Sequence, residues 1–497
     1  MDPKNYSEAD PWDRQSLHNR INLETQSTTI DREKRETMTS TFAVTGATLI
    51  DGRGGAPDIN STIVVRDGRF AEVVSNGTID LPDNVEIIDA TGKFLLPGYM
   101  NGNVHLLDGI MMMGTGGVEY LARYEGSFVE VIEEGAQLTL RNGVTTVFDT
   151  WNALEPTLAA RDRIAAGVTQ GSRIFAAGNI VGMGGPFSPD FNFHARQVIS
   201  TTFADRMDAL FAAGVGAELA WLREAEVRAV LRDYISRGVD MVKLAISDHL
   251  TAIGFTRTYL TFPERILRVM AEEIHNAGLP LLSHTLALNA LEIAADIDSD
   301  VMIHPTWNGG MPIPDDVIQK IVDKRIGTGI QPLTDDYGKR LLDAGHPFGG
   351  LANEGHVLSE RKLIEAGANL IVATDAGCTT HDVLNDLGAN LHEDRPWTLG
   401  EDHFTWVKAL RSRGLSPMGA IQAMTHNIAE SYNKLDDFGT IEVGKVADFV
   451  LLNSDPLEDT ERLRDIAAVY KEGVQVDREA LPVKKIVTAP AGTPIPS

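Results

Sequence analysis

Five side chains able to bind a metal ion or move a proton stand at or near the ends of short apolar segments that are far apart in the chain. They are His105, Lys243 in MVKLAI, His284 in PLLSH, His304 in VMIHP and Asp375 in NLIVATD. Imidazole nitrogen and carboxylate oxygen are good ligands for Zn²⁺ and similar first-row cations. The sequence therefore predicts a metal site assembled from distant segments.

Lys243 from this set and the nearby Asn103 have less usual chemistry. The ammonium of Lys243 is not a ligand, and it becomes one only if CO2 adds to the amine to give a carbamate with two anionic oxygens. Lys243 could instead pair with Asp240 or Asp248, although an uncompensated ammonium on an apolar strand is costly. Asn103, two residues before His105, is either a weak amide ligand or a hydrogen-bonding neighbour of the ligands.

These side chains fall within a pattern of alternating strands and helices. Short β-branched apolar runs separated by helical stretches favour an α/β fold with a parallel sheet, and eight such units favour a (β/α)8 TIM barrel. In such barrels the catalytic residues lie at the carboxyl ends of the strands. The eight predicted strands span residues 93–100, 145–149, 173–178, 241–246, 280–284, 301–305, 326–332 and 369–375.

The predicted barrel, residues 93–435, is flanked on both sides by β-rich segments. We expect residues 42–92 and 436–497, the latter with a C-terminal tail, to build one small β-sandwich from the two ends of the chain. Residues 1–41 are polar with few apolar positions, so we expect a disordered or loosely docked arm. The barrel is longer than a minimal one, with the excess in 179–240 and 333–368.

Charge, hydropathy and cysteine content narrow the range of possible partners and cellular locations. The 497 residues carry a formal net charge of −26, which disfavours nucleic acid and anionic membrane surfaces. No apolar stretch approaches the ~20 residues that a membrane span needs. A single cysteine, Cys378, excludes an internal disulfide and fits a reducing compartment. We expect a cytoplasmic homo-oligomer acting on a small molecule.

Six motifs in order resemble those of the amidohydrolase superfamily. They are LPGYMNGNVH, GVDMVKL, LLSHT, IHP, ATDAG and, at the return to the terminal β-rich region, GKVADFVLL, and the similarity spans about residues 42–475. Most members have His-X-His on the first strand, whereas this chain has Asn103-X-His105. This version resembles the branch that holds phenylurea hydrolases and molinate hydrolase.

The resemblance implies one divalent transition metal: zinc, or else cobalt, manganese or iron. A second metal is expected to be weak or absent, since an amide oxygen replaces an imidazole. Such a metal activates a bound water, and the hydroxide attacks a carbonyl while Asp375 acts as general base. Lys243 is the second residue assigned to catalysis. The predicted metal-site residues are Asn103, His105, Lys243, His284, His304 and Asp375.

The predicted reaction is cleavage of a carbonyl C–N or C–S bond in a urea, carbamate, thiocarbamate or amide. A phenylurea or thiocarbamate xenobiotic is the preferred substrate. A dipeptidase or cyclic-amide hydrolase is the alternative within the family, and a barrel that has lost its metal and activity is the alternative outside it. His249, His381 and Met183, the last in a glycine-rich loop at 182–193, are candidate substrate contacts.

Overall fold

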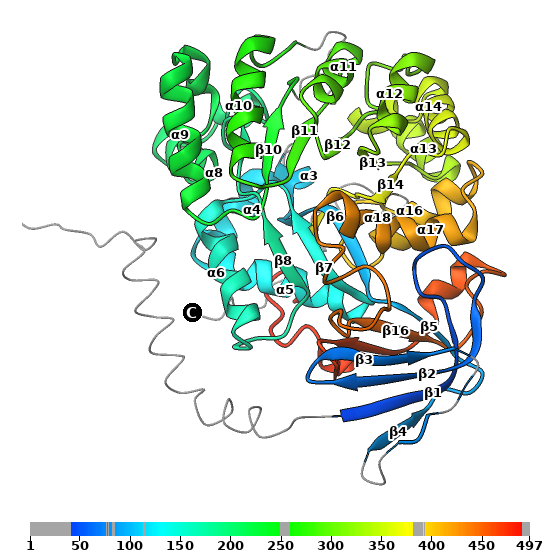
Figure 1. The fold of residues 1–497 in the computed structure, drawn as a ribbon. Helices are drawn as coiled ribbons and strands as arrows, with labels where there is room; N and C mark the ends of the chain where they lie inside the picture. The colour runs from blue at the N-terminus through cyan, green and yellow to red at the C-terminus, as the bar shows by residue number, and fades with distance from the viewer. Residues whose placement is uncertain are drawn as a thin grey trace, which may run out of the picture.

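The computed structural model describes residues 41–489, except 76, 78, 82–84, 113–115, 249–258, 381–390 and 392. The predicted N-terminal arm, except its last residue Thr41, lies outside the described residues. The same holds for His249 and His381, two of the predicted substrate contacts. Figure 1 shows the fold, with a large α/β body above a smaller β region.

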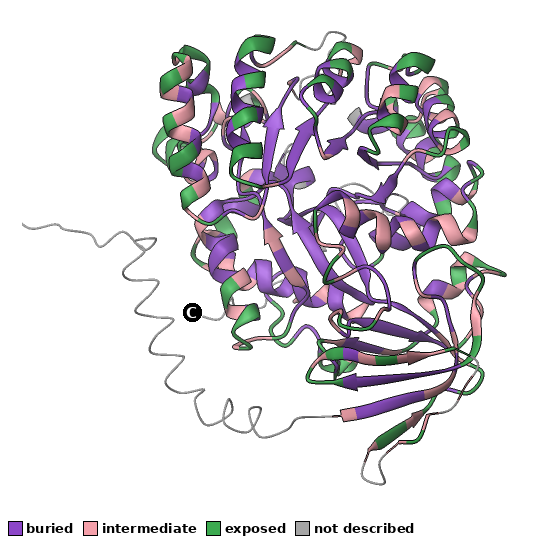
Figure 2. Ribbon diagram, in the orientation of Figure 1, coloured by how far each residue is buried: buried purple, intermediate pink, exposed green. Residues whose placement is uncertain are grey.

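Two parallel sheets form the centre of the α/β body. Their strands are almost entirely buried, as Figure 2 shows, because helices pack around them. The six-stranded sheet runs in the order β14 (Leu370–Val372), β13 (Gly327–Ile330), β12 (Val301–Ile303), β11 (Leu281–His284), β10 (Val242–Ala245), β9 (Ile180–Val181). The four-stranded sheet runs in the order β15 (Ala376–Cys378), β6 (Tyr99–Leu107), β7 (Val144–Asp149), β8 (Arg173–Ala176).

Backbone hydrogen bonds join these two sheets at both sides. The Asn103 carbonyl in β6 accepts bonds from the amides of Thr374 and Asp375 beyond β14, at 3.0 and 2.9 Å. The amide of Asp240, just before β10, donates to the carbonyl of Ala176 in β8 at 2.8 Å. The strand pairing itself remains divided between two sheets, so one continuously closed barrel stays a prediction.

The predicted strands from 145–149 to 369–375 coincide with β7, β8 and β10 to β14 within a few residues. The first was wrong, because residues 93–100 belong to two strands. β5 (Phe94–Pro97) pairs with the terminal sheet, and β6 begins at Tyr99 and continues past His105. The chain changes sheets at Gly98, whose amide donates to the Asp448 carbonyl at 2.8 Å.

Helices cover the outside of the parallel sheets (Figure 1). In α10, Leu267, Met270, Ala271 and Ile274 are buried, which is the spacing of one helix face. No helix in the described part of the chain combines the length and apolar character of a membrane span. The helices are α3 (Gly109–Met112), α4 (Gly117–Tyr124), α5 (Phe128–Arg141), α6 (Leu154–Ala165), α7 (Phe193–Arg196), α8 (Thr201–Ala212), α9 (Glu224–Ser236), α10 (Glu264–Asn276), α11 (Leu288–Asp296), α12 (Asp315–Asp323), α13 (Asp335–Asp343), α14 (Glu354–Glu365), α16 (Asp402–Arg411), α17 (Pro417–Ala423) and α18 (His426–Ser431).

The terminal segments form one mixed, eight-stranded sheet. Antiparallel pairing of β5 with β16 joins the two ends of the chain, as the sequence predicts. Its separate core includes Phe449 stacked on Tyr470, with ring centroids 4.3 Å apart. The pairing shows one sheet, so the two-layered sandwich stays a prediction. The strands are β1 (Thr41–Leu49), β2 (Asp58–Arg66), β3 (Arg69–Val74), β4 (Glu86–Asp89), β5, β16 (Phe449–Leu452), β17 (Ile466–Lys471) and β18 (Val474–Gln475).

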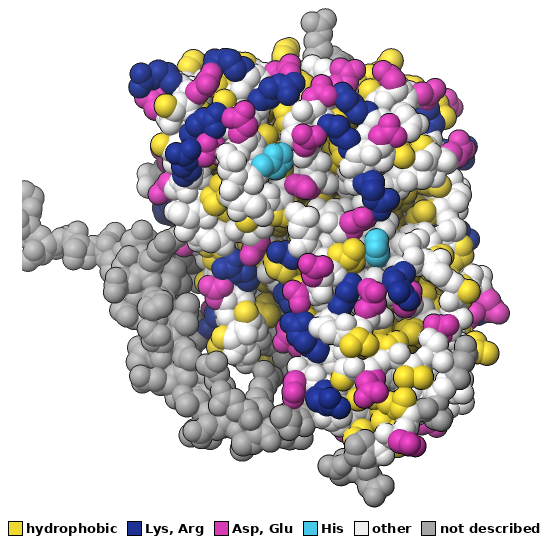
Figure 3. All heavy atoms as spheres, viewed as in Figure 1, with side chains coloured by type: hydrophobic (Ala, Val, Ile, Leu, Met, Phe, Trp, Pro, Cys, Tyr) yellow, Lys and Arg dark blue, Asp and Glu magenta, His cyan; other side chains and the backbone are white. Residues whose placement is uncertain are grey.

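The charged side chains are distributed on the surface in mixed sign. Figure 3 shows Lys and Arg interspersed with Asp and Glu over the helices on the face that it presents. Many of them form ion pairs, such as Lys320 with Asp296 and Lys324 with Asp298. On this face the acidic side chains are therefore interspersed with basic ones (Figure 3).

Candidate functional site

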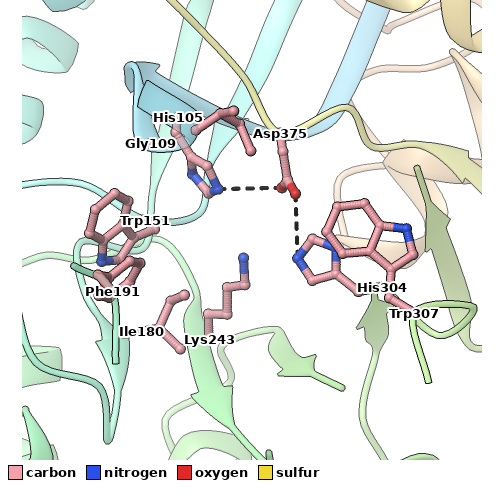
Figure 4. A pocket seen from close by; sticks show the side chains of 10 residues that line it. His105, Gly109, Trp151, Ile180, Phe191, Lys243, His304, Trp307 and Asp375 are labelled. Atoms are coloured by element: carbon pink, nitrogen blue, oxygen red, sulfur yellow. Dashed lines mark ion pairs between the residues drawn. The ribbon is translucent and has the colours of Figure 1, made fainter. Parts of the chain in front are cut away.

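The site lies at the carboxyl ends of the parallel strands. His105 is part of β6, Lys243 of β10 and His284 of β11, while His304 and Asp375 come at or just beyond the ends of β12 and β14. The parallel pairing of β10 with β11 and of β11 with β12 aligns Ala245, His284 and Ile303, so His284 and His304 lie at one edge and Lys243 two residues before it. The tertiary structure therefore brings together the five residues that the sequence singles out: Figure 4 shows His105, Lys243, His304 and Asp375 around one cavity, and His284 packs against His304.

Two of these residues have left-handed backbone conformations. His304 has φ +64° and Asp375 has φ +58°, a region that costs a non-glycine residue about 1–3 kcal/mol. Both backbones are held by a neighbouring strand: the His304 amide donates to the Gly329 carbonyl, and the Asp375 amide donates to that of Asn103. The fold thus fixes the turn at which each side chain leaves its strand.

Asp375 lies between two imidazoles. Its Oδ1 is 3.3 Å from His105 Nε2 and its Oδ2 is 3.4 Å from His304 Nε2, as the dashed lines in Figure 4 show. Burial by itself raises the pKa of Asp375, but His304, His105 and Lys243 together lower it below the ordinary value. Asp375 is therefore a buried carboxylate anion at neutral pH.

His304 is held as a neutral imidazole. Burial lowers its pKa to about 4, although Asp375 acts in the opposite direction. Its Nδ1 lies 2.8 Å from Gln331 Oε1, so Nε2 is the nitrogen that faces Asp375. The ring of His284, fully buried at the end of β11, meets the His304 ring edge to face at a centroid distance of 4.9 Å.

Lys243 is completely buried and points toward the same centre (Figure 4). Its Nζ donates to Thr150 Oγ1 at 3.1 Å and to Asn103 Oδ1 at 3.4 Å. Burial lowers its pKa to about 8. Asp240, one of the partners considered for Lys243, pairs with Arg161 at 2.9 Å.

Asn103 connects the lysine and the carboxylate. Its amide nitrogen donates to Asp375 Oδ1, and its amide oxygen accepts from Thr150 and Lys243. Both ends of the side chain are thus used in hydrogen bonds to site residues. This arrangement corresponds to the hydrogen-bonding alternative of the sequence analysis.

The donor set fits a divalent transition metal. Within the described residues, no three His, Cys, Asp or Glu side chains already surround one point as ligands would. The chemistry of the groups is nevertheless that of a metal site: a carboxylate anion, with the Nε2 atoms of two imidazoles directed at it. The buried Nδ1 of His105 has no hydrogen-bond partner among the described residues.

The cavity over this centre is mostly apolar. Three large aromatic side chains line it, namely Trp151, Phe191 and Trp307, together with Ile180. Sequence reasoning missed all of them, although the glycine-rich loop containing Phe191 was predicted to contact substrate. Met183 of that loop is buried and is not among the residues that line this cavity.

Asp149 and Gln331 are two polar residues that the sequence analysis also passed over. Asp149 is buried at the end of β7, where it accepts bonds from the Leu106 amide and Asn152. Burial raises its pKa to about 6, and His105 partly offsets that rise. Asp149 ends its predicted strand and Gln331 is the next-to-last residue of its own, and a position at a strand end was the signal that had identified the other candidates.

A model of the amidohydrolase family matches residues 94–476. The chain belongs to the amidohydrolase family. This family assignment supports a fold of the TIM-barrel type for the two parallel sheets, and the matched segment runs from β5 to the end of the terminal sheet.

Two solved structures are similar over nearly the whole chain. One is that of molinate hydrolase, with 49% identity, a TM-score of 0.89, and coverage of 92% of this chain and 98% of that chain. The other is phenylurea hydrolase B, with 50% identity, a TM-score of 0.88, and coverage of 90% and 100%. Together with the family match, these structures show that the chain is a hydrolase acting on C–N bonds.

More distant relatives have a different activity. Imidazolonepropionase of Thermoplasma volcanium is 24% identical over 410 residues, covering 80% of this chain and 84% of its own length. This sequence identity is about half of the identity to molinate hydrolase and phenylurea hydrolase B. This match therefore adds little to the choice of substrate.

Proposed function

We propose that the chain hydrolyses uncharged ureas or thiocarbamates of the xenobiotic type, with a divalent transition metal, zinc being the first choice. The observation that carries this proposal is a buried polar centre, Asp375 between His105 and His304, beneath an aromatic cavity. An apolar cavity favours substrates without charge, because a charged group would lose its hydration there. The similarity to molinate hydrolase and phenylurea hydrolase B supports the same substrate class.

His105, His284, His304 and Asp375 would hold the metal, with Lys243 as a further ligand once its amine carries a carbamate. When bound, such a cation polarises a carbonyl and makes water more acidic. Since Asn103 is hydrogen bonded through both ends of its amide, we assign it to holding Asp375 and Lys243 in place. This assignment supports one metal per chain, with a second weak or absent.

Asp375 is the residue suited to move the proton. It is an anion within the cavity lining, so it can accept a proton from the attacking water and pass it to the leaving nitrogen or sulfur. The aromatic side chains around it exclude bulk water, which strengthens its interactions with charges that develop in the reaction.

Lys243 is proposed to carry a carbamate in the active enzyme. The neutral amine adds to CO2, forming an N–C bond and releasing one proton, and the product carries one negative charge shared by two oxygens. Its fully buried Nζ lies near Asp375 and has neutral hydrogen-bond partners in Asn103 and Thr150. Lys243→Ala should inactivate the protein, with partial rescue by short-chain carboxylates. A labelled-bicarbonate NMR signal should be present in the wild type and absent in the variant.

The alternatives predict different substrates. A dipeptidase needs a cation to bind the substrate carboxylate. Within the described lining of the cavity Lys243 is the one Lys or Arg side chain, and as a carbamate it would no longer be a cation. A barrel that has lost its activity predicts a protein that retains no metal.

The proposal further places this enzyme in the cytoplasm as a homo-oligomer.

A substrate panel with metal analysis tests the proposal. The purified chain should retain one transition metal and cleave arylureas or dialkyl thiocarbamates in preference to dipeptides and N-acyl amino acids. Turnover confined to the charged substrates would favour the peptidase alternative. Failure to retain any metal would favour the inactive one.

A further inference from the structure

The cavity has two aromatic walls on opposite sides of the polar centre. Figure 4 shows Trp151, Phe191 and Ile180 on one side of Lys243, and Trp307 beside His304 on the other. The Trp307 ring stacks on His304 with centroids 4.6 Å apart. A carbonyl placed over the polar centre would thus have an apolar surface on each side.

The wall formed by Trp151 and Phe191 is flat, and Trp151 is the side chain that is fixed in it by further contacts. Their rings stack with centroids 4.4 Å apart and an interplanar angle of 19°, and Trp151 also packs on Phe211 at 5.3 Å. Trp151 Nε1 donates to Asn179 Oδ1 at 3.1 Å. Asn179 in turn donates to the Met183 carbonyl at 2.8 Å, which ties the tryptophan to the loop that leads to Phe191.

The space between the walls is narrow. The cavity volume is about 20 Å³, enough for a water molecule but too small for an aromatic ring. Gly109 sets part of this width, because a Cβ there would lie 3.0 Å from His105 Cδ2 and 3.1 Å from Trp151 Cζ3. A substrate ring must therefore enter by displacing a wall side chain. Phe191 is suited to this, since it lies in the loop before α7, whereas Trp151 comes only two residues after the end of β7.

We infer that the Trp151–Phe191 wall binds a flat substituent on the substrate carbonyl, and that Phe191 determines the preference for an aromatic over a saturated ring. Trp307 covers the substituent on the other side. This inference rests on the proposed function and adds to it the residues that would select among such substrates: Trp151 and Phe191 for a flat group on one side of the carbonyl, and Trp307 for the group on the other.

A matched pair of ureas tests the role of Phe191. N,N-dimethyl-N′-phenylurea and its N′-cyclohexyl counterpart share the carbonyl and differ in whether the ring is flat. We expect the wild type to favour the phenyl compound in kcat/KM, and Phe191→Leu to reduce that preference about 2- to 12-fold, the range that an aromatic pair contributes. Phe438→Leu is the control, because Phe438 packs near Phe175 and is not among the residues that line this cavity.

Binding of uncleavable ketones separates this inference from the hydrolase assignment. Benzyl isopropyl ketone and its cyclohexylmethyl counterpart replace both heteroatoms by carbon, and their dissociation constants follow from tryptophan fluorescence. A wild-type preference for the benzyl ketone that Phe191→Leu lowers would support the wall even if no urea were cleaved. An unchanged preference in both assays would overturn the inference, even while urea hydrolysis upheld the function.

Discussion

Two buried clusters of charge in this molecule are built in opposite ways. Beside α13 and α14, Arg413 donates to Glu360 at 3.0 Å, to Asp335 at 2.8 Å and to the Leu333 carbonyl at 3.1 Å. The guanidinium thus has acceptors from three different residues, as its several N–H donors allow. Such a cluster locks two helices and the segment after α16 together.

The cluster at the ends of the parallel strands is not saturated in this way. Asp375 is shared between two imidazoles, while the buried atoms His105 Nδ1 and Gln331 Nε2 have no hydrogen-bond partner in the part of the chain that the structure describes. Leaving a buried polar atom unmatched costs about 1–3 kcal/mol. The comparison indicates that the first cluster serves stability and the second is arranged to interact with a ligand.

Removing the charge of Asp375 should have the largest effect. Asp375→Asn removes a metal ligand and the proton acceptor together, so kcat/KM should fall by about 10²–10⁴-fold. The thermal stability measured in the same preparations should change little by comparison. Wild-type turnover in this variant would refute the assignment of the site.

Breaking the saturated cluster should affect stability instead of turnover. Arg413→Met leaves Glu360 buried without its cation, and we expect a loss of about 3–5 kcal/mol in the free energy of unfolding. Urea denaturation measures this loss. The double variant Glu360→Met/Arg413→Met is the control, because removing both charges should recover most of the stability. Equal destabilisation in both variants would contradict this interpretation.

Changing Asn103 should have an intermediate effect on activity. Asn103→Leu has a similar volume and removes the hydrogen bonds to Asp375 and Lys243, so metal affinity or turnover should fall about 10–100-fold. Asn103→His tests the metal number by elemental analysis, since an added imidazole would recruit a second metal. Two tightly held metals in the wild type would contradict the one-metal assignment.

The smallest expected effect concerns a buried histidine outside the site. His356 in α14 bonds through Nδ1 to the Leu351 carbonyl at 2.9 Å, and burial lowers its pKa from 6.5 to about 4. The unfolded chain therefore binds a proton at this position below its ordinary pKa, whereas the folded chain does so only near pH 4. This contribution to stability is present above about pH 6.5 and is lost as pH falls toward 4.

Replacing His356 should make the free energy of unfolding depend less on pH below pH 7. From pH 7 to about pH 5 the wild type should lose about 2 kcal/mol through His356, and His356→Gln should lose less over the same interval. Denaturation curves at the two pH values measure the difference. An identical loss in wild type and variant would show that other groups control acid unfolding.

Much of the framework could be read from the sequence. Seven predicted strands coincide with β7, β8 and β10 to β14, because buried parallel strands are continuous apolar runs bounded by turns. The first predicted strand was wrong, since nothing local to LPGYM shows that Pro97 and Tyr99 belong to different sheets. The sandwich, the closed barrel and the role of each metal-site residue remain predictions.

The sequence by itself determined which residues could hold a metal, because strand ends and residue types are local features. His105, Lys243, His284, His304 and Asp375 were found in this way. Only the tertiary structure decided what surrounds them: Trp151 follows one strand, Phe191 lies in a loop and Trp307 follows another strand. Their meeting depends on how loops pack across strand ends, and aromatic residues in loops carry no periodic pattern that would indicate a shared cavity.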